Sequence, residues 1–235
     1  MRSGRFQPRF RPTTGCREKP LTHRTRIKIC GLTRAEDVAA AVDAGADAIG
    51  FVFYDKSPRH IAPERAAELA RKLPPFVVPV GLFVNAGAVE IARAVALIPN
   101  LLLQFHGDET PAQCRSAGRP YLRAVRMAPG FDLLDFARSY ADAQGLLLDA
   151  FVEGYGGGGK VFDWSLVPRG VALPLVLSGG LNAANVAAGI VQVRPWAVDV
   201  SSGVESAKGI KDALAIRRFC DAVREADARI AACQT

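Results

Sequence analysis

The segment Ile27-Lys28-Ile29-Cys30-Gly31 is a short β-branched run that ends at a thiol and a glycine, and a helical pattern follows at once. Isoleucine alternates with other side chains at period two, which predicts a strand from Ile27 to Cys30. Gly31 ends the strand, and Thr33 with Glu36 three residues later predicts a capping box for the next helix. The segment therefore predicts a strand–helix unit with the Cys30 thiol at the carboxyl end of the strand.

The same strand–helix unit recurs along the chain. Further apolar strand patterns lie at residues 47–53, 77–83, 101–105, 121–126, 146–148, 175–177 and 196–200. Helical patterns lie at residues 33–44, 63–72, 88–97, 110–117, 131–140, 182–193 and 211–227, with a short helix at 163–167. The strands are near-continuous apolar runs, as expected for a parallel sheet that is covered on both faces. Eight such units predict a single-domain α/β protein, a closed (β/α)8 TIM barrel, with an open doubly wound sheet as the alternative.

The positive charge of the chain is concentrated near its beginning. The formal net charge is +7, and residues 1–26 hold eight of the 30 basic residues but one of the 23 acidic residues. We interpret residues 1–24 as a basic, disordered extension and residues 25–235 as the barrel. An upstream start site or functionless extension, an organelle transit peptide and a nucleic-acid-binding segment are the alternatives for the extension. Scarce serine argues against a transit peptide. The lack of aromatic residues beyond Phe6 and Phe10 argues against a nucleic-acid-binding segment.

The cysteines indicate a reducing compartment. They are scattered, odd in number and without a CxxC pair, which argues against a disulfide framework and a zinc site. No apolar run reaches the length of a membrane span, and the first residues lack a hydrophobic signal core. We therefore predict a cytoplasmic protein with no metal, no cofactor and no membrane partner. The five cysteines are Cys16, Cys30, Cys114, Cys220 and Cys233.

Polar side chains collect just after the predicted strands. They are Cys30 after the first strand, Arg59 after the second, His106 after the fourth, Asp149 after the sixth and Asp199 on the eighth. In a (β/α)8 barrel these positions converge on the carboxyl face, where active sites lie. Each residue alone has a structural explanation, such as Cys30 as a small apolar side chain or Asp199 as the partner of a lysine. Their shared position predicts an active site.

Three glycine-containing loops follow the last three strands. Their candidate phosphate-binding residues are Gly157, Gly158, Gly159, Gly179, Gly180, Ser201 and Ser202. The first loop matches the GxGxxG and GxxxxGK patterns, but it follows the sixth strand, and Val161 stands where a magnesium-binding Ser or Thr is required. Backbone N–H groups in such loops bind phosphate, and barrel enzymes often place a phosphate beside the last two strands. The loops therefore predict a phosphorylated substrate.

Residues 27–220 resemble the phosphoribosylanthranilate isomerases, the (β/α)8 enzymes of tryptophan biosynthesis. The matching motifs are KICGLT (28–33), GADAIGFVFYDKSPR (45–59), QFHG (104–107), LLLDA (146–150), YGGGGKVFDW (155–164), LSGGL (177–181) and VDVSSGVE (198–205). Several motifs in the right order are more specific than any one of them. The chain departs from the family pattern at His60, where an aromatic residue is common, and at Phe105, where leucine is usual. The basic extension lies outside the pattern.

The resemblance implies an Amadori rearrangement of N-(5-phosphoribosyl)anthranilate to 1-(o-carboxyphenylamino)-1-deoxyribulose 5-phosphate. Cys30 corresponds to the general base, Asp149 to the general acid, and Arg59 to the residue that holds the anthranilate carboxylate. His106 and Asp199 would line the substrate pocket, and the three glycine loops would hold the phosphate. We therefore expect a monomer whose partner is a small phosphosugar, with no nucleic acid.

Other activities are alternatives to this interpretation. A histidine-pathway aminoaldose isomerase also performs an Amadori rearrangement, but it would be expected to use an acid after the first strand, where this chain has Cys30. Indole-glycerol phosphate synthase needs a lysine–glutamate set that has no counterpart after these strands. A non-catalytic phosphate binder and an RNA-associated protein are the non-enzyme alternatives. What ionises the thiol is open at this point, with Lys28 and the bound substrate as candidates.

Overall fold

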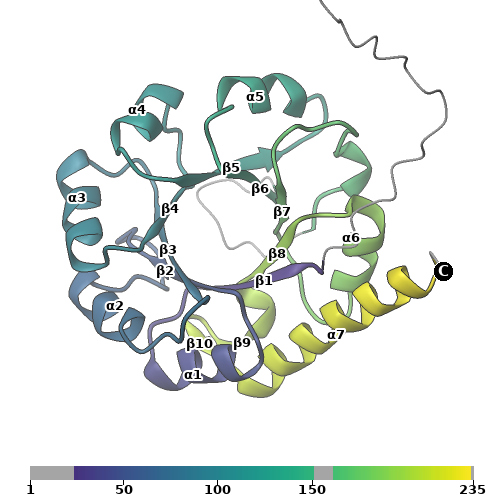
Figure 1. Cartoon of the computed structure of the whole chain (residues 1–235), viewed down its shortest axis with the longest axis horizontal. Helices are drawn as coiled ribbons and strands as arrows, with labels where there is room; N and C mark the ends of the chain where they lie inside the picture. Colours follow the sequence, from purple (N-terminus) through teal and green to yellow (C-terminus); the bar gives the residue numbers. More distant parts are fainter. Residues whose placement is uncertain (1–23, 151–160, 234–235) are drawn as a thin grey trace, which may run out of the picture.

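The computed structural model describes residues 24–150 and 161–233. Eight parallel strands form a closed barrel in chain order, surrounded by helices (Figure 1). The last strand pairs with the first in register from Arg26 beside Ala197 to Ile29 beside Val200. This pairing confirms the predicted (β/α)8 barrel and rules out the open doubly wound sheet.

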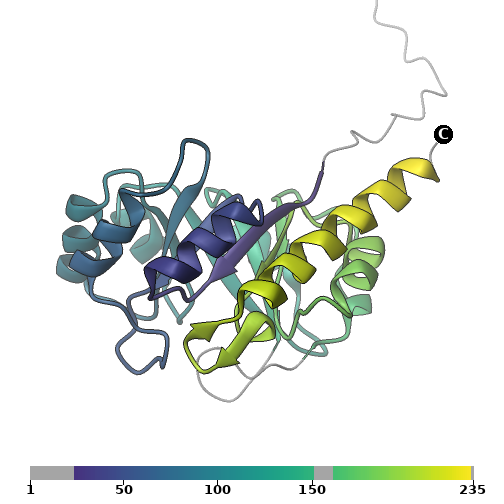
Figure 2. The ribbon, with the colours of Figure 1, turned by 90° about the horizontal axis from the view of Figure 1, so that it is seen from below.

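The elements follow the predicted order of strands and helices. The strands are β1 (Arg26–Cys30), β2 (Ala48–Val52), β3 (Val78–Phe83), β4 (Leu102–Phe105), β5 (Tyr121–Met127), β6 (Gly145–Ala150), β7 (Leu175–Leu177) and β8 (Ala197–Val200). The helices are α1 (Ala35–Asp43), α2 (Pro63–Ala70), α3 (Ala88–Leu97), α4 (Pro111–Ser116), α5 (Leu133–Ser139), α6 (Val186–Val193) and α7 (Ala213–Ala232). Two 3₁₀ turns, η1 (Trp164–Leu166) and η2 (Ser202–Val204), follow β6 and β8. Helix α7 runs beside α1 and α6 along the outside of β1 (Figure 2).

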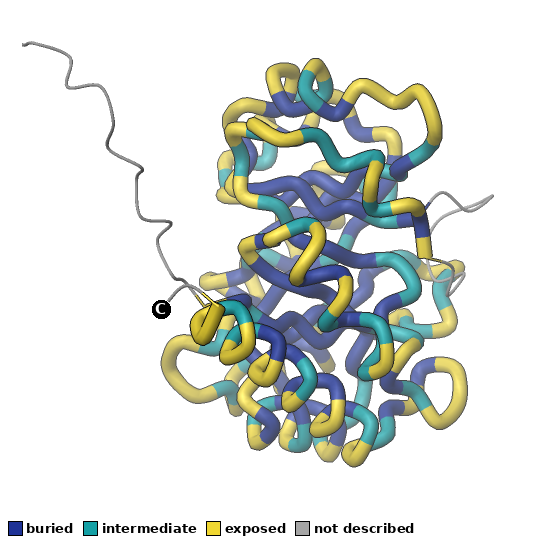
Figure 3. Tube along the Cα trace, turned by 90° about the vertical axis from the view of Figure 1, so that its right-hand side faces the viewer, coloured by how far each residue is buried: buried dark blue, intermediate teal, exposed yellow. Residues whose placement is uncertain are grey.

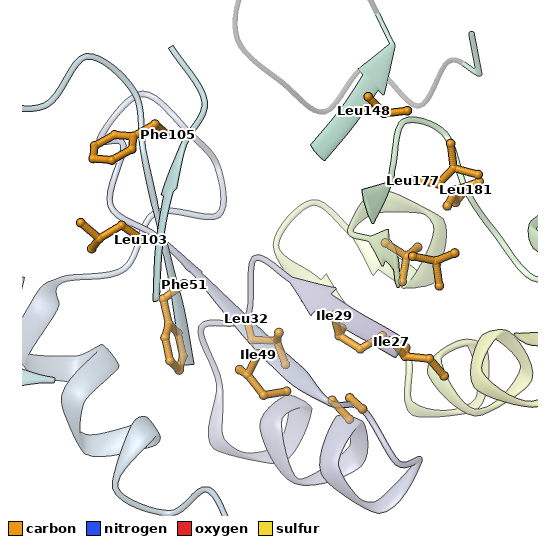
Figure 4. Close-up of a cluster of buried hydrophobic side chains, with 14 of the residues drawn as sticks. Ile27, Ile29, Leu32, Ile49, Phe51, Leu103, Phe105, Leu148, Leu177 and Leu181 are labelled. Carbon is orange, nitrogen blue, oxygen red and sulfur yellow. The ribbon is translucent and has the colours of Figure 1, made fainter. Parts of the chain in front are cut away.

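Two separate apolar layers explain why the strands are apolar on both faces. The larger layer lies between the strands and the helices, and Figure 4 shows part of it, including Ile29, Ile49 and Leu148. The smaller layer contains no helix residue and fills the barrel interior; its members are Ala124, Leu147, Val176 and Ala197. Buried residues accordingly follow the strands, whereas exposed residues lie on the outer faces of the helices and in loops (Figure 3).

The capping box predicted at the start of the first helix is wrong. Helix α1 begins at Ala35, and its N-cap residue, Arg34, makes no side-chain capping bond. Thr33 instead donates its hydroxyl to the Gly209 carbonyl oxygen at 3.4 Å, so this side chain is engaged by a distant loop. A capping box of the expected chemistry does occur at α4, between Thr110 and Gln113.

The main differences from the sequence expectation are a missed hairpin, the bounds of α7 and the start of α6; β6 also extends to Ala150, so Asp149 lies within this strand rather than after it. The antiparallel strands β9 (Glu205–Ala207) and β10 (Ile210–Lys211) were not predicted, because such short strands carry no period-two pattern. Helix α7 therefore starts after Lys211, where the Asp212 side chain accepts a bond from the Ala215 N–H, and it extends to Ala232. Helix α6 starts at Val186 rather than at 182, since the side chains of Asn182 and Asn185 hold a turn before it.

The β9–β10 hairpin lies at the end of the barrel toward which β1 runs (Figure 2). A β-carbon at Gly209, in the turn of this hairpin, would lie 2.8 Å from the carbonyl oxygen of Pro58 in the loop after β2. The hairpin is therefore packed against the loop that carries Arg59.

The predicted basic extension, residues 1–24, lies outside the described residues except for its last member. Arg24 donates to the Asp47 carboxylate with an N···O distance of 2.8 Å, so the described chain begins with an ion pair to the barrel. Within the described ranges, no helix has the length and apolarity that a bilayer crossing requires, and no three His, Cys, Asp or Glu side chains are grouped for metal binding.

Candidate active site

A polar layer lies next to the smaller apolar layer inside the barrel. The four residues of the smaller apolar layer are each followed, two positions later and on the same face of the strand, by a polar residue. These polar residues are Arg126, Asp149, Ser178 and Asp199. Since strands in a closed parallel barrel run in one direction, this layer faces the carboxyl end. The period of the strands therefore brings the predicted acids to the barrel mouth.

Cys30 and Asp199 are brought together by Lys28. The Lys28 ammonium donates to Asp199 Oδ1 at 2.8 Å, and both side chains are about 5 % exposed. The Ser178 hydroxyl donates to the other carboxylate oxygen at 3.2 Å. Cys30 stands two residues after Lys28 on β1 and faces the same interior, where it is buried. Asp199 therefore has the lysine partner that was its structural explanation in the sequence analysis, and this partner is Lys28.

Gly50 provides the space in which the thiol and the ammonium meet. It is the register partner of Cys30 on β2, and a β-carbon there would lie 2.8 Å from Cys30 Sγ and 3.1 Å from Lys28 Nζ. Burial raises the pKa of the Cys30 thiol, and the positive charge of Lys28 acts in the opposite direction. Burial likewise disfavours the charged form of Lys28, yet its pKa is raised because Asp199 and Cys30 outweigh burial.

His106 and Asp149 form the second cluster. His106 Nε2 lies 3.1 Å from Asp149 Oδ2, and His106 Nδ1 lies 3.0 Å from the Gln104 amide nitrogen. Because the Gln104 amide donates to Nδ1, the network assigns the proton of a neutral imidazole to Nε2, which then donates to the carboxylate. This contact crosses the interior from the end of β4 to β6, past β5.

Gly179 allows the Asp149 carboxylate to approach the loop after β7. Its φ of +79° lies in the left-handed region, which side chains other than glycine rarely adopt. A β-carbon there would lie 2.8 Å from Asp149 Oδ1 and 2.6 Å from the Ala150 nitrogen. The predicted phosphate loop and the predicted acid are therefore in direct contact.

Arg59 is held by a carboxylate from the β9–β10 hairpin. Its Nε and Nη2 donate to the two oxygens of Glu205 at 2.7 and 2.8 Å, and Lys211 Nζ donates to Glu205 Oε1 at 2.8 Å. The aliphatic part of Arg59 packs over Gly31, the residue after Cys30. The hairpin thus fixes a guanidinium beside the thiol.

Ser201 links the loop after β8 to Cys30. Its hydroxyl donates to the Cys30 carbonyl oxygen at 3.0 Å, and Lys211 Nζ donates to the Ser201 carbonyl oxygen at 2.9 Å. The loops after β7 and β8 lie against each other, since a β-carbon at Gly203 would overlap the Leu181 carbonyl oxygen. Gly180 and Ser202 lie in these two loops, whereas Gly157, Gly158 and Gly159 lie outside the described residues.

A buried ion pair that the sequence analysis did not identify supports His106 from outside the barrel. The Glu109 carboxylate accepts bonds from the backbone nitrogens of Asn85 at 2.7 Å and Gly107 at 2.9 Å. Arg123 donates to the carbonyl oxygens of Phe105 and Gly107, at 2.9 and 3.0 Å, and to Glu109 at 3.3 Å. The turn that carries His106 is therefore clamped on both sides.

These contacts were missed because their members carry no local signal. Lys211 and Arg123 are single basic residues in apolar or irregular segments, and Glu109 follows the last residue of the QFHG motif by two positions. Glu205 is the last residue of the VDVSSGVE motif, which is the one signal that pointed to it.

Comparison with known proteins identifies the family of the chain. The family model of N-(5'-phosphoribosyl)anthranilate (PRA) isomerase matches residues 27–222. The chain belongs to the phosphoribosylanthranilate isomerase family. The N-(5'-phosphoribosyl)anthranilate isomerase of Methylibium petroleiphilum is 76 % identical over 209 residues, which cover 89 % of this chain and 98 % of the relative.

Two solved structures of phosphoribosyl anthranilate isomerases match the fold. That from Thermotoga maritima is 43 % identical with a TM-score of 0.80, and the match covers 86 % of this chain and 99 % of the other. The other, in complex with reduced 1-(o-carboxyphenylamino)-1-deoxyribulose 5-phosphate, is 40 % identical with a TM-score of 0.77 and the same coverage. The family predicted from the ordered motifs is therefore confirmed.

Proposed function

We propose that this chain catalyses the Amadori rearrangement of N-(5-phosphoribosyl)anthranilate to 1-(o-carboxyphenylamino)-1-deoxyribulose 5-phosphate, a step of tryptophan biosynthesis, by general acid–base catalysis. The observation that supports it best is that a thiol, Cys30, and a carboxyl group, Asp149, both enter the barrel interior near the carboxyl ends of their strands. Membership of the isomerase family gives the reaction, and these two side chains are the groups that would carry it.

Asp149 is the proposed general acid. Opening the ribofuranose ring requires a proton on the ring oxygen as the bond from C1 to that oxygen breaks, and the anthranilate nitrogen then forms an imine with C1. Asp149 Oδ2 lies 3.1 Å from His106 Nε2, so the imidazole holds this carboxyl group in position. Gly179 leaves room for this carboxyl at the edge of the phosphate loop.

Cys30 is the proposed general base. A thiolate in the barrel mouth removes the proton from C2 of the open imine, and the resulting enamine rearranges to the ketone. A free thiol with a pKa of about 8.5 is only slightly ionised at neutral pH, so the base requires assistance from nearby positive charge. Lys28, Lys211 and Arg59 are positive charges that interact with this thiol.

The remaining residues are proposed to hold the two anionic ends of the substrate. Arg59 would bind the anthranilate carboxylate, a pairing that guanidinium groups commonly make. In this structure the Nε and Nη2 of Arg59 donate to another carboxylate, that of Glu205. The loops that contain Gly179, Gly180, Ser201 and Ser202 would bind the phosphate, together with Gly157, Gly158 and Gly159. His106 and Asp199 would line the pocket between these ends.

Turnover of three variants tests the assignment, followed by the loss of phosphoribosylanthranilate fluorescence. Cys30→Ala and Asp149→Asn should each reduce kcat by about 10²–10⁴-fold, the usual contribution of one acid or base. Arg59→Ala should mainly raise KM, because it removes a binding contact. Cys233→Ala, an exposed cysteine in the same chain, is the matched control. Near-normal turnover of Cys30→Ala would exclude it as the base.

Two further properties belong to the same proposal. The described cysteines are free thiols, in keeping with a cytoplasmic location. The chain is proposed to act as a monomer, because all the residues assigned above come from one barrel. Light scattering that gives twice the chain mass of 25.1 kDa at working concentration would contradict a monomer.

A further inference from the structure

One of the three cations near the proposed base, Lys28, is buried inside the barrel and paired with Asp199. We propose that Lys28 stabilises the thiolate form of Cys30, and that Asp199 limits this stabilisation by pairing with the same ammonium. The effect of Lys28 on catalysis rests on the proposed function, whereas its effect on the ionisation of the Cys30 thiol is a property of the ligand-free protein. Lys28 acts on the reaction through Cys30, so it is a positioning residue and not a catalytic one.

The geometry places the two groups within reach of each other. Lys28 and Cys30 are i and i+2 on β1, so their side chains enter the same interior. The site of a β-carbon on Gly50 is 2.8 Å from Cys30 Sγ and 3.1 Å from Lys28 Nζ. The two atoms therefore lie within about 6 Å of each other, a distance at which a charge favours the ionised form of an opposite group.

Burial makes this charge effective. The Lys28 side chain is 5 % exposed, and the thiol is also buried, so little solvent screens their interaction. A buried ammonium requires a partner, and Asp199 supplies it at 2.8 Å. Lys28 is thus held charged by Asp199 in the free protein and is available to a neighbouring thiolate.

The charges around Cys30 act in opposing directions. Lys28 on β1 and Lys211 on β10 lower the pKa of the thiol, whereas burial and Asp199 on β8 raise it. Arg59, in the loop after β2, is a further positive charge that interacts with the thiol. The two members of the buried pair, Lys28 and Asp199, therefore have opposite effects on the ionisation of the thiol.

This arrangement predicts opposite outcomes for the two members of one ion pair. Lys28→Met removes the cation and leaves the Asp199 anion, so the thiol should titrate about one to three pH units higher. Asp199→Asn removes the anion and leaves the ammonium, so the thiol should titrate lower than in the wild type. A role in packing alone would not shift the two variants in opposite directions.

The test is titration of Cys30 in the full chain without substrate. Thiolate absorbance in the ultraviolet is followed against pH, and each protein is compared with the same protein carrying Cys30→Ser, so that the other cysteines cancel. Lys72→Met removes an exposed lysine beyond α2 and serves as the matched control, with no expected shift. The pH dependence of kcat/KM is measured in parallel and should move with the thiol.

The double variant Lys28→Met/Asp199→Asn keeps the test valid if the single change prevents folding, since it leaves no unpaired buried charge. Its midpoint should lie above that of Asp199→Asn and below that of Lys28→Met. A midpoint in the double variant at or below that of Asp199→Asn would overturn the inference, as would an unchanged midpoint in a folded Lys28→Met protein.

Failure of the proposed function gives a different result. If Cys30 is not the base, Cys30→Ala keeps its turnover, while the midpoints still differ between Lys28→Met and Asp199→Asn. If the inference alone fails, Cys30→Ala is inactive and the thiol midpoint does not depend on Lys28.

Discussion

Removal of Arg123 should destabilise the barrel far more than an ordinary ion pair would indicate. Arg123 and Glu109 are 6 % and 4 % exposed, and their N···O distance is 3.3 Å. Arg123→Met keeps most of the side-chain volume but leaves the Glu109 carboxylate without its cation and two carbonyl oxygens without their donor. Breaking a buried pair in this way costs roughly 3–5 kcal/mol.

The lower part of that range is expected here, because Glu109 retains two backbone N–H donors, from Asn85 and Gly107. A loss of about 3 kcal/mol is a large share of the roughly 5–15 kcal/mol that stabilises a typical domain. Urea unfolding at neutral pH measures it as a lower midpoint at unchanged slope. Activity should also fall, since the clamped turn carries His106.

The matched control is an exposed pair of nearly the same length. Arg138 and Asp135 are 3.2 Å apart but 73 % and 71 % exposed, so Arg138→Met should change stability by roughly 0–1 kcal/mol. The double variant Arg123→Met/Glu109→Gln should recover part of the loss, because it removes the unpaired charge. If Arg123→Met costs no more than Arg138→Met, or if the double variant recovers nothing, burial of this pair does not have the assigned effect.

Two further changes test the hairpin and the phosphate loop. Burial opposes ionisation of Glu205, but Arg59 and Lys211 outweigh it and lower its pKa. The stability that Glu205 contributes over a Glu205→Gln variant should therefore be complete above about pH 4.3, the pKa of an unfolded glutamate, and be lost as pH falls through the folded-state value. A difference in urea midpoint that persists in acid would contradict this. Gly179→Ala should lower kcat at least about tenfold, because its β-carbon meets the proposed acid. Gly130→Ala, at a similar φ of +81° with open space around it, should leave kcat unchanged, and equal losses in both would remove the explanation.

Much of the site could be predicted because its residues follow strands. Cys30 and His106 stand at or just beyond a strand end, Asp149 and Asp199 stand one residue before one, and the carboxyl ends of parallel strands converge. The hairpin that holds Arg59 could not be predicted in the same way. Strands of two and three residues show no alternation, and their stability comes from contacts with loops that are distant in the chain.

The sequence by itself determined the order of the elements and the end of the barrel at which polar groups gather. Both follow from local features: apolar runs of strand length, glycine at strand ends and motifs in a fixed order. Only the tertiary structure decided which charges pair. Lys28 and Asp199 are 171 residues apart and Arg59 and Glu205 are 146 apart. The first pair forms because β1 closes against β8, and the second because the loop after β2 packs on the hairpin, so their geometry depends on barrel closure rather than on any neighbouring residue.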